Sequence, residues 1–475
     1  MKLNKFLTLF SFSLFLLLGS CDKNFEEINT DPNNPTDVPS NLLLAGTLRN
    51  TANRIQDTYL AGESPLCWVQ QLSKPVYNDG DLYKPRLGSI QNLWDVFYSQ
   101  VIMDAKVMKN LAVEEGNEKM QGVSLVVQAY SFQILTDAFG NIPFSEACQN
   151  GNFTPIYNTT MEVYTGIIEM LTEANTLLDG AGEIDASQDL LYGGNSILWK
   201  KYANSLKFRA LMRISGSVDV SSQLQTIVDS GELFSSNDEE AKLLFLGADP
   251  NANPYYEGLV LTGRIEEWCM GENLVQMMDG TDTGVFDNRL EVYANLSEDG
   301  VYTGLPAGLS TTPTATFNEP LSYIGDDMLI AESHAFFMSY AQLNFLLAEA
   351  AEKLFISGGS TAAATYYAEG INASFQSVGA DIGSYPTAYI GGSTGLAQIG
   401  KQSYIALFMQ GYEAWAEYRR TGYPILTPAP GGVISGIPSR FSYPGDEQSD
   451  NAVNYSSAVN EQGPDLLTTP IAWMN

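Results

Sequence analysis

Histidine, cysteine and basic side chains are scarce in this chain of 475 residues, and each shortage excludes a class of function. His334 is the sole histidine, so metal sites built from several histidines are excluded. A Ser-His-Asp or Cys-His mechanism would have to use this residue, which is expected to cap or pack just ahead of a predicted helix. Lysine and arginine number 24 against 55 acidic residues, for a net charge of −31. Because phosphate binding needs a basic face, no nucleic-acid partner is expected.

The four cysteines are too few and too scattered for a disulfide framework or a cysteine-based zinc site. Cys21 belongs to the export signal described below, and whether two of Cys67, Cys148 and Cys269 form a disulfide is left open. The sequence also lacks a glycine-rich phosphate loop, a zinc-binding helix motif and a nucleophile elbow. We therefore expect no cofactor and no catalytic residue.

The N-terminus has the form of a bacterial export signal. Lys2 and Lys5 precede an apolar run over 6–18, which is shorter than the roughly 20 apolar residues that span a bilayer. Gly19 and Ser20 then lead to Cys21, as in a lipobox whose cysteine becomes the acylated first residue. We predict a signal peptide over 1–20, lipidation at Cys21 and an acidic, proline-containing tether over 21–40. The protein is therefore expected to be exported and anchored to a membrane by lipid.

The body over 41–475 is predicted to be all-α. Apolar residues recur at helical spacing, one stripe per segment, over 48–59, 94–112, 118–138, 160–179, 196–215, 343–354 and 404–418. Pairs of such helices have the size used in helical repeats, although the period is irregular. The stretches at about 216–330 and 421–465, and a shorter one at 379–395, are rich in loop-forming residues. We expect a helical scaffold with long irregular insertions that present a surface.

Aromatic and amide side chains gather in one segment of poor helical periodicity and suggest a ligand site. The candidates are Trp68, Gln71, Tyr77, Asp81 and Tyr83, joined by Trp268 from the irregular insertion. Exposed rings contact the apolar faces of sugars or extended peptides, while amides and carboxylates bind hydroxyls or peptide groups. Trp268 lies among charged residues, so one side of its ring is expected to be near water. The alternative for each ring is core packing.

The acidic residues do not single out a calcium site or a catalytic carboxylate pair. Asp279, Asp282 and Asp287 alternate with glycines that would allow a loop around calcium, but the spacing is not that of an EF-hand. A plain acidic turn is the alternative. Glycoside hydrolysis needs only two carboxylates, and 55 acidic residues supply too many pairs to single one out.

Several motifs together resemble the SusD/RagB family of nutrient-binding outer-membrane lipoproteins. Besides the lipobox, they are Phe25-Glu-Glu-Ile-Asn-Thr-Asp-Pro-Asn-Asn-Pro35, Leu135-Thr-Asp-Ala-Phe-Gly-Asn-Ile-Pro-Phe144, Trp199-Lys-Lys-Tyr-Ala-Asn-Ser-Leu-Lys-Phe-Arg209, Gly411-Tyr-Glu-Ala-Trp-Ala-Glu-Tyr-Arg-Arg-Thr-Gly422 and Ile437-Pro-Ser-Arg-Phe-Ser-Tyr-Pro444. The resemblance spans essentially the whole chain after the signal peptide, in the family's order. It implies a tetratricopeptide-like helical scaffold that supports an irregular ligand-binding region.

The resemblance also implies a function. Such proteins are not enzymes, are lipid-anchored at the cell surface, and act as ligand-capturing lids over a TonB-dependent, SusC-like transporter. We therefore expect a non-catalytic lipoprotein of the outer membrane that captures an oligosaccharide or peptide for import. The alternatives are an exported glycoside hydrolase with a carboxylate pair and a structural or adhesion lipoprotein.

Overall fold

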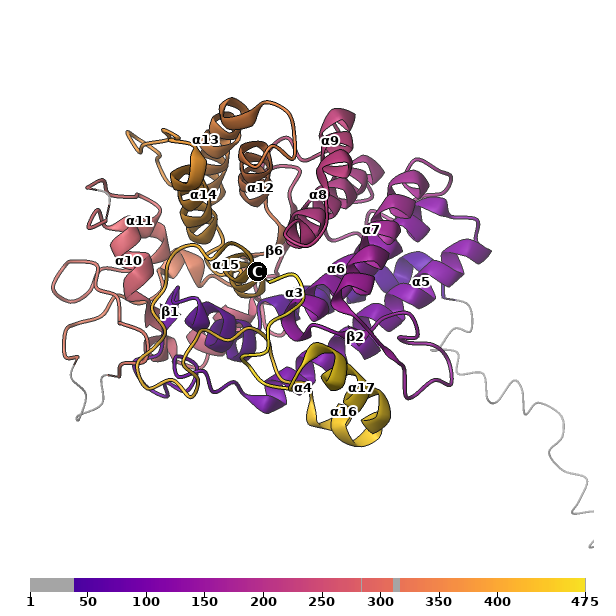
Figure 1. Ribbon diagram of the computed structural model, residues 1–475, viewed down its shortest axis with the longest axis horizontal. Coiled ribbons are helices and arrows are strands. Elements are labelled where there is room, and N and C mark those ends of the chain that lie inside the picture. The colour runs from indigo at the N-terminus through magenta and orange to yellow at the C-terminus, as the bar shows by residue number, and fades with distance from the viewer. Residues whose placement is uncertain (1–37, 283, 311–316, 475) are drawn as a thin grey trace, which may run out of the picture.

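The computed structural model describes residues 38–282, 284–310 and 317–474 (Figure 1). The predicted signal peptide, Cys21 and most of the tether lie outside these residues. The first described turn, Ser40–Leu43, is fastened to the body. Ser40 donates hydrogen bonds from its backbone N–H and its hydroxyl to the Glu115 carboxylate, at 2.8 and 2.5 Å. Asn41 accepts one from the backbone N–H of Asp185 at 2.7 Å.

The N-terminal half consists of helices packed against their sequence neighbours, as Figure 1 shows from α5 to α8. They are α3 (Leu44–Ile55), α4 (Leu87–Val96), α5 (Met103–Glu114), α6 (Glu118–Phe139), α7 (Thr160–Leu177), α8 (Ser196–Ile214) and α9 (Ser221–Ser230). The segments Thr58–Leu66 and Phe97–Ile102 are π-helical, and the second of them joins α4 to α5 without a break. The mainly helical fold predicted from the apolar stripes is confirmed.

Local sequence signals set several of these helix ends. Asn117 caps α6 by accepting a hydrogen bond from the N–H of Met120, and α6 ends at Gly140, which has a φ of 85°. Thr159 and Glu162 form a capping box at the start of α7. The predicted segments 118–138, 160–179 and 196–215 therefore agree with α6, α7 and α8 to within two residues.

The C-terminal half repeats the helix-pair arrangement. Its helices are α10 (Glu272–Met278), α11 (Leu290–Tyr293), α12 (Tyr340–Glu352), α13 (Gly359–Ser377), α14 (Gly392–Ala406), α15 (Gly411–Thr421), α16 (Gly445–Asp450) and α17 (Ala452–Gln462). Helix α12 packs against α13 and α14, and also against α8 of the N-terminal half. The two sets of helix pairs thus form one tetratricopeptide-like scaffold.

Three short antiparallel strand pairs connect segments that are distant in sequence. They are β1 (Leu72–Ser73) with β5 (Cys269–Met270), β2 (Ile142–Pro143) with β3 (Tyr157–Asn158), and β4 (Ala241–Leu244) with β6 (His334–Met338). The first and third pairs attach the irregular stretch at 216–330 to the rest of the body.

The structure corrects the expected helices at several places. The stripe over 404–418 is not one helix, because α14 and α15 are separated at Met409, whose φ of 62° is left-handed. At Gly411 a Cβ would lie 2.6 Å from the Ala61 carbonyl oxygen, so the glycine lets α15 pack closely on the π-helical segment. Helix α13 was not expected, and α16 and α17 lie within a stretch predicted as loop.

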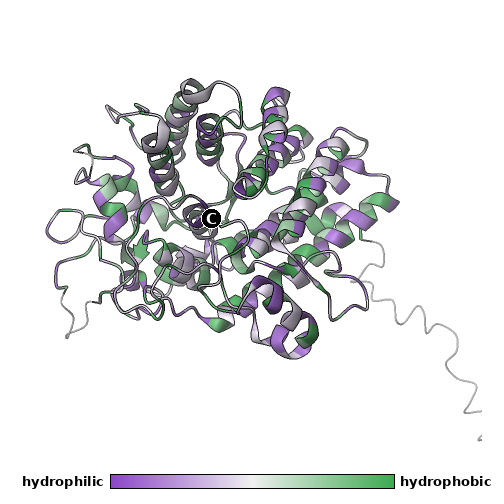
Figure 2. Ribbon diagram, in the orientation of Figure 1, coloured by the Kyte–Doolittle hydropathy of each residue, from purple (hydrophilic) through white to green (hydrophobic). Residues whose placement is uncertain are grey.

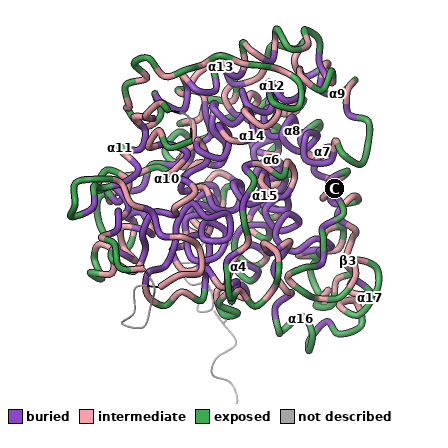
Figure 3. The backbone as a smooth tube through the Cα atoms, turned by 60° about the vertical axis from the view of Figure 1, so that its left-hand side comes forward, coloured by how far each residue is buried: buried purple, intermediate pink, exposed green. Residues whose placement is uncertain are grey.

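The centre of the molecule combines apolar side chains with a buried ionic network. Figure 2 shows hydrophobic and hydrophilic residues side by side on the peripheral helices, and Figure 3 shows buried backbone concentrated around α6, α14 and α15. Arg213 of α8 is 1% exposed and pairs with Glu417 and Glu413 of α15 at 2.8 and 2.6 Å. Its Nε lies 3.3 Å from Asp137 of α6. The network therefore joins three helices that are distant in sequence.

None of the helices in the described ranges is long and apolar enough to cross a bilayer.

Candidate functional site

A cleft of about 410 Å³ opens where β6, the end of α3 and the α14–α15 connection meet. It has the volume of a small-molecule site. Its lining consists of Gln56, Asn253, Tyr255, Val292, Asp327, Met328, Ile330, Glu332, Ser333, His334, Phe336, Ser377, Val378, Phe408, Met409 and Gln410.

The floor of the cleft carries three aromatic rings. Phe336 is half-buried, whereas Phe408 and Tyr255 are 4% and 1% exposed. Phe336 lines the cleft, while its strand neighbour Phe337 packs on the buried ring of Tyr130, as expected from the alternation of side chains along a strand. Phe336 is thus the accessible ring of the three, and it offers an apolar contact that suits the C–H surface of a sugar.

Backbone strain next to the floor shapes the cleft. Met409 adopts a left-handed conformation that is costly for a residue with a side chain, and its neighbours Phe408 and Gln410 both line the cleft. The Gln56 amide stabilises this turn by donating to the Met409 carbonyl oxygen at 3.2 Å. The turn between α14 and α15 therefore places one apolar and one amide side chain at the same site.

Polar groups in the lining have hydrogen-bonding capacity left over. The Tyr255 hydroxyl and Ser333 Oγ are buried and form no hydrogen bond within the described ranges. A buried hydroxyl without a partner costs free energy, which a water molecule would recover. The Tyr255 hydroxyl lies beside Gly62 of the π-helical segment, which is outside the cleft lining, so it is not offered to a ligand in the cleft.

The rim of the cleft is acidic. Asp327, Glu332 and His334 are all exposed there. Partial desolvation, with a smaller effect of Lys242, lowers the pKa of His334 below its usual value, so the ring is neutral at neutral pH. The expected capping role of His334 is wrong, because the residue lies in β6 and Ser339 caps α12.

A second, much smaller cavity lies beneath the cleft. It encloses about 20 Å³ and shares Gln56, Phe336 and Gln410 with the cleft lining. Tyr412, whose buried hydroxyl has no partner among the described residues, lines it together with Glu413 of the ionic network. This volume holds about one water molecule, so the polar contacts continue from the cleft floor towards the core.

Two other hollows are less suited to sugar. A groove of about 730 Å³ beside α5, α6 and α7 is lined by charged residues, and two of these, Lys109 and Glu173, pair at 3.0 Å. A hollow of about 330 Å³ beside α14 and α15 is lined by Arg420 and Glu349, which also pair with each other, at 2.5 Å. Most of their charged groups already have partners.

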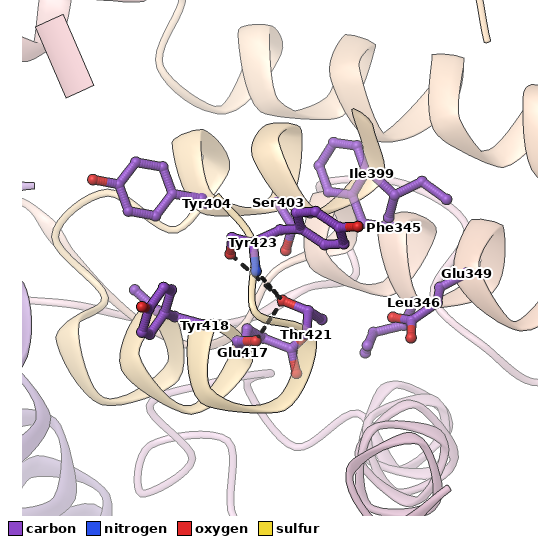
Figure 4. A pocket seen from close by; sticks show the side chains of 12 residues that line it. Phe345, Leu346, Glu349, Ile399, Ser403, Tyr404, Glu417, Tyr418, Thr421 and Tyr423 are labelled. Atoms are coloured by element: carbon purple, nitrogen blue, oxygen red, sulfur yellow. Dashed lines mark hydrogen bonds between the residues drawn. The ribbon is translucent and has the colours of Figure 1, made fainter. Parts of the chain in front are cut away.

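Figure 4 shows a further cavity, between α12, α14 and α15. It encloses about 10 Å³, no more than one water molecule needs. The Thr421 hydroxyl there donates to the Glu417 carbonyl oxygen at 2.8 Å and accepts from the Tyr423 N–H at 3.2 Å. This cavity is an interstice of the helix packing.

Most of the ring and amide candidates predicted from sequence are core residues. Trp68 is 0% exposed and packs edge-on against Trp415, with ring centroids 5.0 Å apart. The buried Gln71 amide donates to the Tyr404 carbonyl oxygen at 2.6 Å, and the buried Tyr83 hydroxyl accepts from the Ala429 N–H at 2.7 Å. The irregular backbone of this segment reflects close packing, and these side chains are not available to a ligand.

Trp268 and Asp81 are also buried, through contacts between segments that are distant in sequence. The pairing of β1 with β5 does bring the N-terminal cluster beside Trp268, but the ring is 0% exposed, with the Lys74 ammonium 3.1 Å from its centroid. The expectation that water reaches Trp268 is therefore wrong. Asp81 accepts hydrogen bonds from the backbone N–H groups of Lys74 and Gly308, at 3.1 and 3.4 Å.

Tyr77 is the one exposed member of the predicted set, at 70%, with a left-handed φ of 53°. It does not line the cleft. A role for Tyr77 in ligand contact stays a prediction.

The structure contradicts the calcium candidate. Asp287 is buried and forms a two-point ion pair with Arg289, at 2.6 and 3.0 Å, while Asp282 pairs with Lys401 at 3.2 Å. Asp279 accepts from the backbone N–H of Thr281, as in a plain acidic turn. No group of three His, Cys, Asp or Glu side chains within the described ranges could hold a metal ion.

The three cysteines of the described ranges, Cys67, Cys148 and Cys269, are free thiols. Cys67 and Cys269 are buried, and partial burial raises the pKa of the Cys148 thiol to about 11. The sequence left open whether two of these cysteines form a disulfide, and in the structure they do not.

Sequence reasoning missed the cleft because its residues come from six separate segments. Phe408 belongs to an apolar helical stripe, which predicted a core position. Phe336 lies in a short segment whose apolar residues show no helical period. The signal that pointed there was Tyr255 after Asn253-Pro254, an aromatic residue in an irregular stretch.

Comparison with known proteins gives consistent results. A family model of the SusD-like type, described as "Starch-binding associating with outer membrane", matches residues 32–444. A search of curated proteins found no significant match. A solved structure described as a chitin-binding protein is 25% identical, with a TM-score of 0.78, covering 90% of this chain and 99% of its own.

Two further solved structures share the fold. A chitin-binding SusD homolog from Flavobacterium johnsoniae is 22% identical, with a TM-score of 0.77, and the match covers 90% of this chain and 98% of that one. A SusD homolog from Bacteroides uniformis is 24% identical, with a TM-score of 0.76, and the match covers 91% and 99%.

Proposed function

Because the chain belongs to the SusD-like family of carbohydrate-binding proteins that associate with the outer membrane, we propose that it captures oligosaccharides in the cleft floored by Phe336. Binding is not followed by catalysis. The protein is anchored at the cell surface through a lipid on Cys21 and delivers its ligand to a TonB-dependent, SusC-like transporter, as the sequence resemblance implies. A lid on such a transporter needs at least about 1,000 Å² of contact.

The observation that carries this proposal is the composition of the cleft. The half-buried ring of Phe336 and the half-buried amide of Gln410 line the same hollow, with the buried ring of Phe408 next to them. Pyranose sugars have the matching surface, with C–H faces that contact rings and hydroxyls that exchange hydrogen bonds. Because two of the similar structures are described as chitin-binding, chito-oligosaccharides are the first ligands to test.

Replacing Phe336 with alanine is expected to weaken oligosaccharide binding about tenfold. A ring–ligand contact contributes about 1 kcal/mol beyond buried area, and tenfold in Kd corresponds to about 1.4 kcal/mol. Titration calorimetry with chito-, malto-, cello- and xylo-oligosaccharides of equal length identifies the series that the wild type binds. The dissociation constants of wild type and variant are then compared on that series. Phe153→Ala is the matched control, because Phe153 is 89% exposed and lies outside the cleft lining.

Three results would contradict the proposal in different ways. Equal affinity of wild type and Phe336→Ala would place the sugar elsewhere. Release of shorter products at enzyme-like rates, about 1–10³ s⁻¹, would favour the carboxylate-pair hydrolase. Failure to bind any glycan would favour a structural or adhesion lipoprotein.

Replacing Cys21 with serine is expected to move the protein from the outer-membrane fraction to the soluble fraction, because serine cannot accept the thioether-linked lipid. Cell fractionation and immunoblotting of the full chain check this result. Cys148→Ser, a cysteine outside the lipobox, is the control and should stay with the membrane. Full retention of Cys21→Ser in the membrane would argue against lipid anchoring at this residue.

A further inference from the structure

The acidic side chains at the rim of the cleft lack neutralising partners. Asp327 and Glu332 are exposed, and neither side chain forms an ion pair or hydrogen bond with any described residue. In the two other large hollows, two of the three lining carboxylates are paired, Glu173 with Lys109 and Glu349 with Arg420. The rim carboxylates therefore keep their negative charge available to whatever enters the cleft.

Positive charge is missing from the same surface. Within the described ranges, no lysine or arginine lines the cleft, and the one basic ring there, His334, is neutral at neutral pH. The nearby Lys242 is engaged by the Glu240 carboxylate, at 2.9 Å. The net charge of −31 adds a negative background over the whole chain.

The floor, in contrast, can accept a neutral sugar. It offers the half-buried ring of Phe336 and the half-buried amide of Gln410. Apolar groups such as the methyl of an N-acetyl substituent would contact the ring, and sugar hydroxyls would exchange hydrogen bonds with the amide. Floor and rim thus differ in what they favour.

We infer that the cleft selects by charge: it binds neutral hexosamine oligosaccharides, binds their amine-bearing forms more tightly, and rejects glycans that carry carboxylates or sulfates. A protonated amine at the rim meets Asp327 and Glu332, whereas a uronate meets two like charges and no cation. This inference rests on the proposed function and adds to it the chemical class of the ligand.

Three oligosaccharides of equal length separate the possibilities, measured by calorimetry at pH 6 in low salt. They are a fully acetylated chito-oligosaccharide, its fully deacetylated form and an oligogalacturonide. We expect the amine form to bind about 5- to 10-fold more tightly than the acetylated form, with no measurable binding of the uronide. Raising the salt to 0.5 M should reduce the amine preference, because the interaction is screened.

The double variant Asp327→Asn/Glu332→Gln should bring the affinity ratio of the amine form to the acetylated form close to 1. Its control, Asp446→Asn/Glu461→Gln, changes the net charge equally at exposed residues outside the cleft lining and should keep the preference. Circular dichroism verifies that both fold.

The outcomes distinguish this inference from the proposed function. Binding of the uronide as tightly as the acetylated sugar, or an unchanged preference in the double variant, would overturn the charge selection and leave carbohydrate capture standing. Absence of binding to all neutral and amine glycans would overturn both.

Discussion

Replacing Arg213 with methionine is expected to lower the free energy of unfolding by about 3–5 kcal/mol, the usual cost of breaking a buried ion pair. The variant leaves Glu413, Glu417 and Asp137 without the cation that all three approach. Burial alone would raise the pKa of Glu413, but Arg213 and Arg209 lower it below its usual value. Loss of Arg213 would therefore leave buried carboxylates that must either remain charged without compensation or take up a proton.

Urea denaturation followed by circular dichroism measures this effect. Lys201→Met is the matched control, because Lys201 lies in the same helix and forms a partly exposed pair with Glu239, at 2.5 Å. An ion pair that water reaches contributes about 1 kcal/mol or less. Adding Glu413→Gln to the Arg213 variant should restore part of the loss, since it removes one uncompensated charge. Equal effects of the Arg213 and Lys201 variants would show that the network contributes little.

Replacing Asp81 with asparagine is expected to stabilise the protein at pH 8 relative to wild type and to have little effect at pH 4. Burial raises the pKa of Asp81 from 3.8 to about 7, partly offset by hydrogen bonds from the backbone N–H groups of Lys74 and Gly308. Between pH 3.8 and about pH 7, the folded protein keeps a proton on Asp81 that the unfolded chain has already lost. The contribution of Asp81 to the stability of the fold therefore falls as pH rises through this range. One pKa unit corresponds to about 1.4 kcal/mol, so the total loss is about 4 kcal/mol.

The quantity to measure is the difference in unfolding free energy between Asp81→Asn and wild type, at several values from pH 4 to pH 8. It should grow with pH by about 4 kcal/mol. Asp79→Asn, in the same loop but exposed and paired with Lys84, is the control and should show no such trend. A difference that stays constant over this range would mean that Asp81 is not protonated in the folded protein.

The sequence predicted the scaffold well because the helices carry their signals locally. The apolar stripes of α6, α7 and α8 and the capping residues Asn117 and Thr159 act within a few residues, so one sequence suffices to locate them. The break at Met409 was not predictable in this way. It arises where α15 packs on a segment some 350 positions earlier in the chain, a contact that no local pattern records.

The candidate site was harder to predict for a related reason. Trp68 and Trp268 lie in segments without helical period, which resembles the pattern of an exposed binding loop. Their burial depends on Trp415 from α15 and on the pairing of β1 with β5, and these are tertiary contacts. Phe336 and Phe408 likewise become cleft residues only when β6 and the α14–α15 connection meet. Residue type indicated the chemistry of the site correctly, but its location depended on the fold.

The fastening of Ser40 to Glu115 has a mechanical consequence. A pull on the N-terminal tether would enter the body at Ser40 and Asn41 and load the end of α5 and the loop that carries Asp185. In Figure 1 this attachment lies on the α5 side, whereas β6, which borders the cleft, lies towards the centre. Tension from the anchored end would therefore be taken up by these hydrogen bonds before it reaches α3, which begins at Leu44 and whose C-terminal end borders the cleft.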